Sequence, residues 1–594
     1  MSHITATRFF QEPPHIGNQF LEDTILVESL QRLFPKDVFQ SIQPDLENLG
    51  QRVVSDILEW ARDSERNPPV LVQYDAWAHR IDEIRTSASW KELHKASAEE
   101  GLISIAYERK YKQWSRLYQL VKLFLFAGAG NLYGCPLAMT DGVARLLELW
   151  GTEADKKEVL PHLLSRDAKQ FWTSGQWMTE TTGGSDVGNT ETIAEHMKHS
   201  KDGRDYTLTG MKYFTSATTS EIAVTLARIK NPDGSLVPGS KGLSTFLLHT
   251  RTPEGKLNGI QVNKLKNKLG TKQVPTAELV MDHTPAKLLG PVNRGVPVIA
   301  TILNITRIHS ALHCISVMRR GIAVARDYAH RRKAQNKFLT EHILHLETLA
   351  GLEAQYRGSL QLLLEVGVLM GKVECEQASK EEDILFRLLT PLLKLYTAKQ
   401  AVSVLSECIE ALGGTGYMED ADIPRLLRDV QVNTIWEGTT NILSLDVWRP
   451  IRSSNALHVY ADAIHKKLQN ANASLKESVE AVRSSLSALL KFAQQNATDN
   501  EQIEINARYF GMSLARIYIG ALLIEHATWS NNPLDAEAAF RHCVANSTPL
   551  FYSVNASEKY RTATRNLALD VDPKNGKPRG CGDRAPNGAI RARF

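Results

Sequence analysis

Apolar positions recur at two different periods along the chain, and the change of period divides it. In residues 1–170 they fall mainly at helical spacing; Val143, Leu146 and Leu147, for example, share one face behind a polar Thr-Asp pair, as in a capped amphipathic helix. In residues 171–290 they alternate in short runs that Pro and Gly interrupt, which is typical of strands. The pattern therefore predicts an N-terminal helical domain followed by a β domain.

Helical spacing returns after Gly295, and two further helical regions follow. Residues 291–450 contain apolar positions at steps of 3, 4 and 3, namely Ile305, Ile308, Leu312 and Ile315, which predicts a helical bundle. Residues 451–570 contain a long apolar stripe that needs another helix to pack against: Ile464, Leu468, Ala471, Leu475, Val479, Val482, Leu486 and Leu489. Residues 571–594 are rich in Gly, Pro and Arg, and we expect a loose tail.

Length and charge refine this division. A chain of 594 residues is too long for a single hydrophobic core, so several domains are expected. The net charge of +4 is nearly balanced for this length. Residues 561–594 hold eight Lys and Arg against three Asp, a net of +5 that exceeds the chain total. The basic excess is thus confined to the C-terminal end, and we expect neither nucleic acid nor an anionic membrane as a partner.

The cysteines and the ends of the chain indicate a compartment. The six cysteines show no paired framework and no metal-ligand spacing, which favours reduced thiols and predicts no bound metal. No uninterrupted apolar stretch reaches the ~18 residues that a membrane span needs, and the N-terminus resembles neither a secretion signal nor a transit peptide. We expect a soluble intracellular protein, and the sequence leaves the cytoplasm and the mitochondrial matrix open.

Two polar segments about 250 residues apart carry the candidate chemistry. Residues 176–187 read Gln-Trp-Met-Thr-Glu-Thr-Thr-Gly-Gly-Ser-Asp-Val, and we call them the hydroxyl-glycine loop. Glycines let backbone N–H groups approach a phosphate or a polar ring edge closely. The second segment comprises residues 412–417 and continues at residues 435–442, where one acid, Glu437, lies in an apolar neutral stretch. Partial desolvation should raise the pKa of this carboxylate towards that of a general base at neutral pH.

These motifs resemble the acyl-CoA dehydrogenase family over about residues 70–450. The pattern Thr-Glu-x-x-x-Gly-Ser-Asp is matched by residues 179–186, and the Glu-Gly-Thr box by residues 437–439. Residues 68–75, the Gly-Gly-Ser-Asp form and residues 441–447 are similar to the AidB-like branch. The resemblance implies an α+β multidomain fold with an N-terminal helical domain, a middle β-barrel-like domain, a C-terminal helical bundle and an added C-terminal helical domain.

The resemblance also implies the reaction and its base. It implies FAD as cofactor and α,β-dehydrogenation of a medium- or long-chain fatty acyl-CoA, with Glu437 removing the α-proton. Some relatives place the base at the position before Arg307. In this chain that residue is Thr306, which cannot act as a base, and this favours Glu437. A flavin hydroxyl and the backbone N–H of the base would bind the enolate oxygen.

Cofactor and substrate contacts follow from the same resemblance. The cofactor contacts it implies are Met178, Thr179, Gly184, Ser185, Phe214, Thr215, Ser216, Arg332, Leu412, Gly413, Gly414, Trp436, Thr439 and Asn441. The substrate contacts are Ser185, Arg307 and Trp436. Arg332 matches an arginine that reaches the flavin pyrophosphate of a neighbouring subunit, although Gln335–Asn336 replace the usual aromatic residue and glycine. Glu410 replaces a common glutamine, and we do not assign it to the cofactor.

Three functions agree with this sequence. The first is an FAD-dependent acyl-CoA dehydrogenase of fatty-acid metabolism, built as a homotetramer (a dimer of dimers), with an electron-transferring flavoprotein as its acceptor. The second is a flavoprotein that holds or sequesters an acyl ligand with little turnover, because the residues that bind are those that react. The third is a nucleic-acid-associated flavoprotein, which rests on the basic tail and on analogy with the AidB-like branch.

Overall fold

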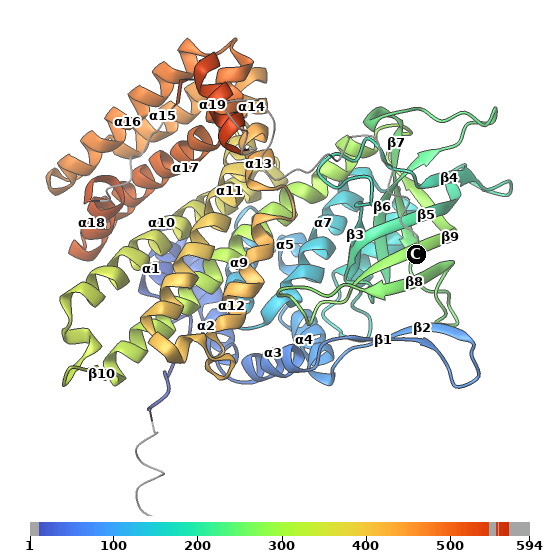
Figure 1. Ribbon diagram of the computed structural model, residues 1–594, viewed down its shortest axis with the longest axis horizontal. Helices are drawn as coiled ribbons and strands as arrows, with labels where there is room; N and C mark the ends of the chain where they lie inside the picture. Colours follow the sequence, from blue (N-terminus) through green and yellow to red (C-terminus); the bar gives the residue numbers. More distant parts are fainter. Residues whose placement is uncertain (1–10, 546–553, 556, 569–594) are drawn as a thin grey trace, which may run out of the picture.

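The computed structural model describes residues 11–545, 554–555 and 557–568. A helical body occupies one end of the molecule and a β domain the other, and a further group of helices packs on the helical body (Figure 1). The tail over residues 571–594 lies outside the described residues. The predicted α+β multidomain fold is confirmed.

The N-terminal part is mainly helical, as predicted. It contains α1 (Thr24–Leu33), α2 (Lys36–Arg52), α3 (Asp56–Arg66), α4 (Ala88–Glu99), α5 (Ser104–Glu108), α6 (Trp114–Ala127), α7 (Gly134–Trp150) and α8 (Glu153–Leu163). Buried apolar side chains of α6, almost all of whose residues are buried, pack against the later bundle. This part therefore shares one core with the C-terminal bundle rather than folding around a separate one.

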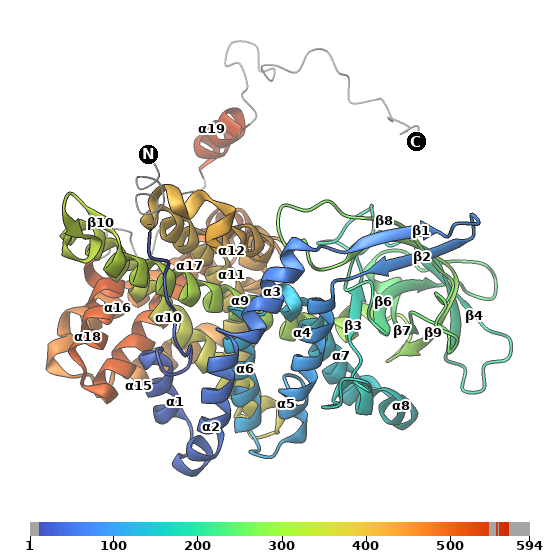
Figure 2. The ribbon, with the colours of Figure 1, turned by 90° about the horizontal axis from the view of Figure 1, so that it is seen from below.

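A β-hairpin that the helical pattern does not predict leaves this body between α3 and α4. Strands β1 (Val70–Tyr74) and β2 (Arg80–Arg85) pair antiparallel, and the Asp75 carboxylate accepts the backbone N–H groups of Trp77 and His79 to close the turn. The hairpin runs along the β domain in both ribbon views (Figures 1 and 2). It is tied there by Asp82, whose Oδ2 accepts the Val262 N–H at 2.8 Å.

The middle domain is a small closed barrel. Its strands are β3 (Ser174–Trp177), β4 (Ile193–His196), β5 (Asp205–Ser216), β6 (Ile222–Ile229), β7 (Leu243–His249), β8 (Ile260–Leu265) and β9 (Thr276–Leu289). Six of them follow the order β3-β6-β4-β5-β9-β7, β8 pairs with β9, and an additional β6–β7 pairing closes the ring. Both β6 and β7 are almost entirely buried. The predicted β-barrel-like domain is confirmed.

Long helices form the C-terminal bundle. They are α9 (Gly295–Arg331), α10 (Ile343–Glu374), α11 (Lys380–Ala411), α12 (Ile423–Val430), α13 (Thr440–Asp446) and α14 (Trp448–Ser453). The two short strands β10 (Lys333–Ala334) and β11 (Lys337–Phe338) connect α9 to α10. Helix α9 packs against α7 and α11, so it links the N-terminal helices to the rest of the bundle.

The added helices are α15 (Ala456–Leu468), α16 (Lys476–Gln495), α17 (Asn500–Ser530), α18 (Pro533–Phe540) and α19 (Glu558–Ala568). The predicted apolar stripe is not one continuous helix face, because a turn after Leu468 separates α15 from α16. Both helices pack against α17 of the same chain, and Val482 lies directly against Gly520. The stripe therefore finds its partner within the chain and needs no second subunit.

In the part of the chain that the structure describes, two helices, α9 and α17, are long and apolar enough to cross a membrane by length and composition. In each, most of the apolar window is buried inside the protein, 72% in α9 and 78% in α17. Burial on all sides is what the central helix of a large helical core requires. Their apolar character is thus explained by the packing of this fold.

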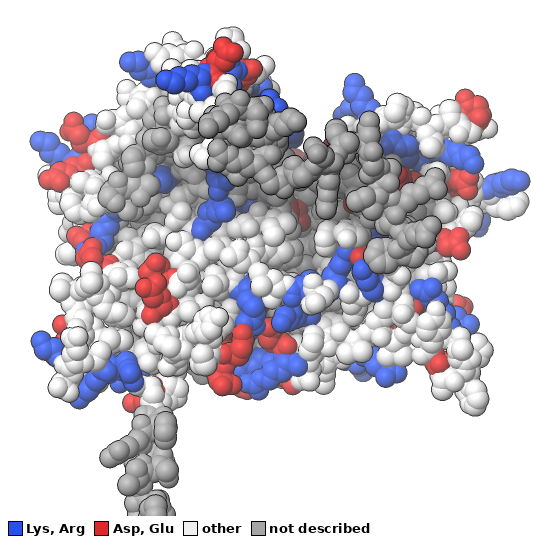
Figure 3. Space-filling view, viewed as in Figure 1, with Lys and Arg blue, Asp and Glu red and all other residues white. Residues whose placement is uncertain are grey.

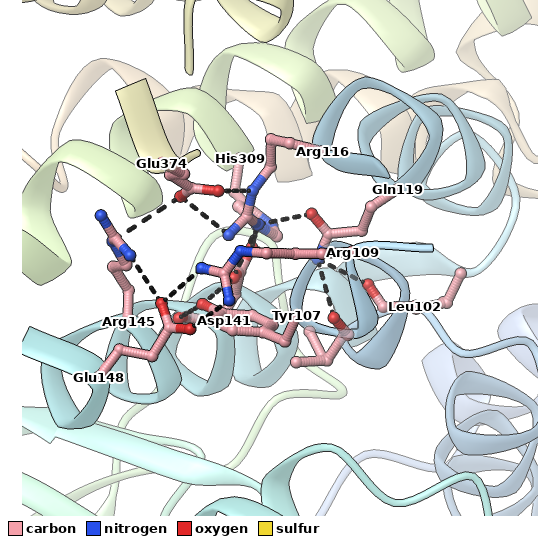
Figure 4. Close-up of polar contacts among 11 residues, drawn as sticks. Leu102, Tyr107, Arg109, Arg116, Gln119, Asp141, Arg145, Glu148, His309 and Glu374 are labelled. Carbon is pink, nitrogen blue, oxygen red and sulfur yellow. Dashed lines mark hydrogen bonds and ion pairs between the residues drawn. The ribbon is translucent and has the colours of Figure 1, made fainter. Parts of the chain in front are cut away.

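A buried ionic network joins α6, α7, α9 and α10 (Figure 4). Arg116 lies at its centre, with Nη1 2.8 Å from Asp141 Oδ2 and Nε 2.7 Å from Glu374 Oε2. His309 Nε2 lies 2.8 Å from the same Asp141 oxygen. Burial opposes ionisation of Asp141, but Arg116 and His309 hold its pKa below the usual range. The network fixes α9 one turn beyond Thr306.

Candidate functional site

Glu437 lies in a tight turn that connects the short helix Gln431–Thr434 to α13. Its φ is 57° and that of Gly438 is 109°, left-handed values that a non-glycine residue adopts only under outside constraint. The Thr306 hydroxyl donates a 2.7 Å hydrogen bond to Glu437 Oε2. Burial raises the pKa of Glu437, opposed by this hydrogen bond and by the charges of Arg307 and Lys394. The carboxylate is thus both aimed and tuned as a general base would be.

Two cations hold the backbone of this turn. Arg307 Nε donates to the Glu437 carbonyl at 3.1 Å, and its Nη2 pairs with Asp446 at 2.8 Å. Lys394 Nζ donates to the Gly438 carbonyl at 2.5 Å. Burial lowers the pKa of Lys394 to about 8. Both groups supply the constraint that the left-handed turn needs, and Arg307, a predicted substrate contact, is already engaged with the turn.

Trp436 is fixed by a chain of hydrogen bonds from α9. Its indole Nε1 donates to Asn433 Oδ1 at 2.8 Å, and Asn433 Nδ2 lies 2.9 Å from His313 Nδ1. Burial, together with the charge of Arg425, lowers the pKa of His313 to about 4. The imidazole is therefore neutral at physiological pH, and Nδ1 can accept from the amide. These hydrogen bonds therefore hold the Trp436 indole, next to Glu437, in one preferred orientation.

A buried ion pair anchors the hydroxyl-glycine loop to the barrel. Glu180 Oε1 lies 2.7 Å from Lys212 Nζ, and Glu180 also accepts the Thr192 hydroxyl and the Glu191 N–H. The Thr179 carbonyl accepts the Tyr213 N–H at 2.9 Å. These contacts join the loop to β5, so the backbone that presents Thr179 is held on both sides.

The hydroxyl-glycine loop also carries two hydroxyl groups that are available to a ligand. Within the described residues, the hydroxyls of Thr179 and Ser185 make no hydrogen bond with the protein. An added Cβ on Gly184 would lie only 3.1 Å from Thr179 Oγ1, so the absence of a side chain lets the backbone pass close to that hydroxyl. Phe214 on β5 is 50% exposed. Free hydroxyls, a close-packed glycine backbone and an exposed aromatic ring fit the polar edge and flat face of a flavin ring.

Two other predicted contacts on β5 are already engaged in the barrel. The Thr215 hydroxyl is buried and donates to the Ala277 carbonyl at 2.9 Å, and Ser216 Oγ lies 3.1 Å from Thr276 Oγ1. Their alternation with Phe214 turns Thr215 inward, as the strand period requires. A cofactor contact from Thr215 would have to come from its backbone.

The base and the loop meet at the junction between the barrel and the bundle. Met178 packs in a cluster with Ile299 and Ile302 of α9, and Thr306 follows one helical turn later. Near the start of the loop, Gln176 Oε1 is buried without a hydrogen-bond partner in the described part of the chain. Residues 130 positions apart or more are thereby placed around one region.

Other predicted cofactor contacts lie elsewhere. Arg332 ends α9 beside β10, at the end of the molecule opposite β3 and β5 in both ribbon views; it is exposed, and its Nη1 contacts Gln11. The Leu412 side chain is 4% exposed, whereas Gly413 and Gly414 face open space. The structure does not bring these residues to the hydroxyl-glycine loop of the same chain.

The last two predicted contacts follow Glu437. Thr439 precedes α13 without capping it through its side chain. Asn441 is exposed, and its Oδ1 accepts from Arg508 of α17 at 3.4 Å. The added helices thus contact the segment that carries the base. Sequence reasoning missed Thr306 as a partner of Glu437, as well as Lys394, Asn433 and the Glu180–Lys212 pair; of these, only Lys394 has a sequence signal, a charged residue within an apolar helix.

Replacing Thr306 by Val should shift the pH dependence of the reaction. The Thr306 hydrogen bond stabilises ionised Glu437 and lowers its pKa, so its loss raises that pKa. A base acts when ionised, and the rising limb of the kcat/KM profile should therefore move to higher pH. Thr528→Val, which removes a hydroxyl bonded only to its own helix, is the matched control. An unchanged profile in T306V would contradict the role given to Thr306.

Sequence comparisons define the class of protein. The AidB N-terminal domain matches residues 11–169, the acyl-CoA dehydrogenase middle domain residues 175–284, and the acyl-CoA dehydrogenase C-terminal domain residues 293–451. A domain described as acyl-CoA dehydrogenase 11 C-terminal domain-like matches residues 455–570. The chain belongs to the acyl-CoA dehydrogenase family.

Individual relatives narrow the position within that family. The chain is 44% identical to acyl-CoA dehydrogenase family member 11 of Caenorhabditis elegans, over 96% of this chain and 94% of that protein. It is 30% identical to AidB of Escherichia coli (strain K12), over 77% and 82% of the two chains. The crystal structure of Caenorhabditis elegans ACDH-11 in complex with C11-CoA superposes with a TM-score of 0.92 at 42% identity, covering 96% of this chain and 98% of that one.

Proposed function

We propose that this protein is an FAD-dependent oxidoreductase that removes the α and β hydrogens of medium- or long-chain acyl-CoA in fatty-acid metabolism. The observation that carries the proposal is the constrained Glu437 carboxylate, whose pKa is raised by burial. Its hydrogen-bond partner Thr306 follows Ile302 by one helical turn, and Ile302 belongs to the apolar cluster against which Met178 of the hydroxyl-glycine loop packs. A base of this kind requires an acidic C–H next to a carbonyl, which an acyl thioester provides.

Each residue has a proposed task. When bound, FAD supplies hydride acceptance. Glu437 takes the α-proton, and Thr306 and Lys394 hold the carboxylate and its turn in place. The Glu437 N–H makes no backbone hydrogen bond in the described residues, so it is free to bind the carbonyl oxygen on which charge develops. Trp436 and Phe214 would exclude water from opposite sides.

Cofactor contacts of the loop are proposed for Met178, Thr179, Gly184 and Ser185, and we further propose that Ser185 contacts the substrate. Arg332 and the Leu412–Gly414 turn would serve the cofactor of a neighbouring subunit, because they lie away from the loop of their own chain. The complex of Caenorhabditis elegans ACDH-11 with C11-CoA supports a substrate with a medium-length acyl chain. Each substrate oxidation releases two electrons that an acceptor must remove, and an electron-transferring flavoprotein is the acceptor that we propose.

FAD should co-purify with the protein at about one per chain. The free hydroxyls of Thr179 and Ser185 and the close-packed glycine backbone of the hydroxyl-glycine loop carry this expectation. The visible spectrum of the purified protein, followed by extraction and identification of the released small molecules, measures it. A folded, colourless protein that does not take up added FAD would contradict the proposal.

The protein should assemble as a homotetramer. Arg332 and Gly413 require a second subunit if they are to reach a flavin, and this requirement is the main support for an oligomer. The apolar stripe from α15 to α16 gives no such support, because α17 of the same chain covers it. Sedimentation velocity at micromolar concentration should give a species near four times the 66.3 kDa chain mass. Monomers alone at that concentration would refute the expectation.

Nucleic acid is not part of the proposed function. On the face seen in Figure 3, acidic and basic side chains are interspersed, whereas nucleic-acid sites need clustered cations. We propose an intracellular location, in the cytoplasm or the mitochondrial matrix. We also keep as proposals the domain boundaries at about residues 170, 290, 450 and 570, supported by the ranges of the domain matches.

A further inference from the structure

Helix α1 and the consecutive helices α17 and α18, far from α1 in the sequence, bring a histidine and two carboxylates together outside the proposed active site. Glu28 lies on α1, His526 near the end of α17 and Asp535 in the first turn of α18. Their potential ligand atoms all lie within 4.8 Å of one another. The cluster therefore joins the N-terminal helices to the added C-terminal helices.

The histidine in this cluster is buried and lacks hydrogen bonds. The His526 side chain is 1% exposed, and within the described residues neither of its ring nitrogens has a hydrogen-bond partner. Its Nε2 lies 3.4 Å from Asp535 Oδ2 and 4.0 Å from Glu28 Oε2. An unsatisfied buried imidazole is costly, and this one is aimed at two carboxylates. A missing partner between the three groups would remove that cost.

The spacing of the three atoms suits a small divalent cation. Zn²⁺ binds imidazole nitrogen and carboxylate oxygen at about 2.0–2.2 Å in a tetrahedron, which separates neighbouring ligand atoms by roughly 3.4 Å. His526 and Asp535 are already at that separation, and Glu28 needs to approach His526 by only a few tenths of an ångström. The Glu28 side chain is 34% exposed, so it can move and leave access for an ion and a water ligand.

The charged groups around the cluster neutralise only one of its two carboxylates. Asp535 is oriented by Arg357, which binds Oδ1 at 2.6 Å, and by the Ser530 hydroxyl, which binds Oδ2 at 2.6 Å. Glu28 has no other ion pair or hydrogen bond in the described residues. Arg357 is itself shared with Glu353. One carboxylate thus remains without a fixed positive partner, and outer contacts of the kind made to Asp535 are typical of metal ligands.

We propose that Glu28, His526 and Asp535 form a structural Zn²⁺ site that fastens α1 to α17 and α18. One imidazole with two carboxylates favours Zn²⁺ over Mg²⁺ or Ca²⁺, which prefer all-oxygen sites. Because the ligands come from both ends of the chain, the ion would stabilise the contact between the N-terminal helices and the added domain. The proposed Zn²⁺ site is separate from Glu437, and the ion takes no part in the proposed reaction.

Isothermal titration of the full-length, FAD-loaded protein with ZnCl₂, after chelator treatment and dialysis, tests this. The wild type should bind one Zn²⁺. Glu28→Gln and His526→Gln should each lower the affinity for that ion by at least about ten-fold. Zn²⁺ should also raise the melting temperature of the wild type, and Mg²⁺ should not. Glu28→Gln changes a partly exposed residue and guards against misfolding of His526→Gln. His458→Gln, at an exposed His–Asp pair, is the matched control and should bind like the wild type.

Three results would overturn the proposal. The first is equal Zn²⁺ affinity and stoichiometry in the wild type and Glu28→Gln, which would place bound ions at other histidines. The second is an equal rise in melting temperature with Mg²⁺. The third is no Zn²⁺ binding by the wild type, which would leave the three side chains as a packing contact between α1, α17 and α18.

Discussion

Glu437→Gln is expected to lower the rate of saturated acyl-CoA oxidation by at least about 100-fold while FAD and the acyl ligand remain bound. The amide keeps the shape of the side chain and can still bond the Thr306 hydroxyl, but it cannot accept the α-proton. The measurement is the steady-state rate with an artificial electron acceptor, alongside the FAD content and ligand affinity of each variant.

Glu410→Gln is the matched control for this substitution. Glu410 is an exposed glutamate near the end of α11, at a position where relatives often carry glutamine, so its replacement should leave the rate nearly unchanged. If Glu437→Gln retained the wild-type rate, the base would have to be another residue, and the role assigned to the constrained turn would be wrong.

Arg116→Met should destabilise the fold by about 3–5 kcal/mol, because it leaves the carboxylates of Asp141 and Glu374 buried without their cation. The side chains of Arg116 and Asp141 are 2% and 0% exposed. The loss should appear as a lower midpoint of thermal or urea unfolding and as reduced soluble yield. Since Asp141 also holds His309 on α9, activity should decline with stability.

Arg387→Met tests whether burial causes that effect. Arg387 pairs with Asp383 at 2.9 Å on α11, but its side chain is 70% exposed. Solvent-exposed pairs contribute less than about 1 kcal/mol, so this variant should unfold almost as the wild type does. An equal loss in both variants would mean that the network of Figure 4 has no special weight.

The order of helical and β regions could be predicted from the sequence because burial imposes its period on each element. Alternation in β5 follows from a strand with one face inside the barrel and one outside, whereas β6 and β7 are buried on both faces. The hairpin of β1 and β2 was missed because it is short, half-exposed and held by contacts with β8 that lie far along the chain. The apolar stripe of the added domain shows the reverse error, since its period continues through the turn between two helices.

The candidate site was predictable in its residues but not in its geometry. Glu437 and the hydroxyl-glycine loop are recognisable as motifs, and the raised pKa of Glu437 follows from its apolar neighbours. The partner that aims it, Thr306, lies 131 residues away, and no local pattern marks that contact. Arg307 and Lys394 likewise hold the turn through backbone carbonyls, which sequence does not specify. Such contacts depend on how α9 and α11 pack.

An anaerobic titration of the purified, FAD-loaded protein with a series of saturated acyl-CoA substrates tests the central claim most directly. The proposed function predicts that the visible flavin absorbance bleaches with acyl chains of medium or greater length in the wild type, and that Glu437→Gln binds the same substrates without bleaching. Wild-type protein that binds acyl-CoA tightly but keeps its oxidised flavin spectrum at every chain length would contradict the claim and would identify the protein as a container for acyl ligands instead of a catalyst.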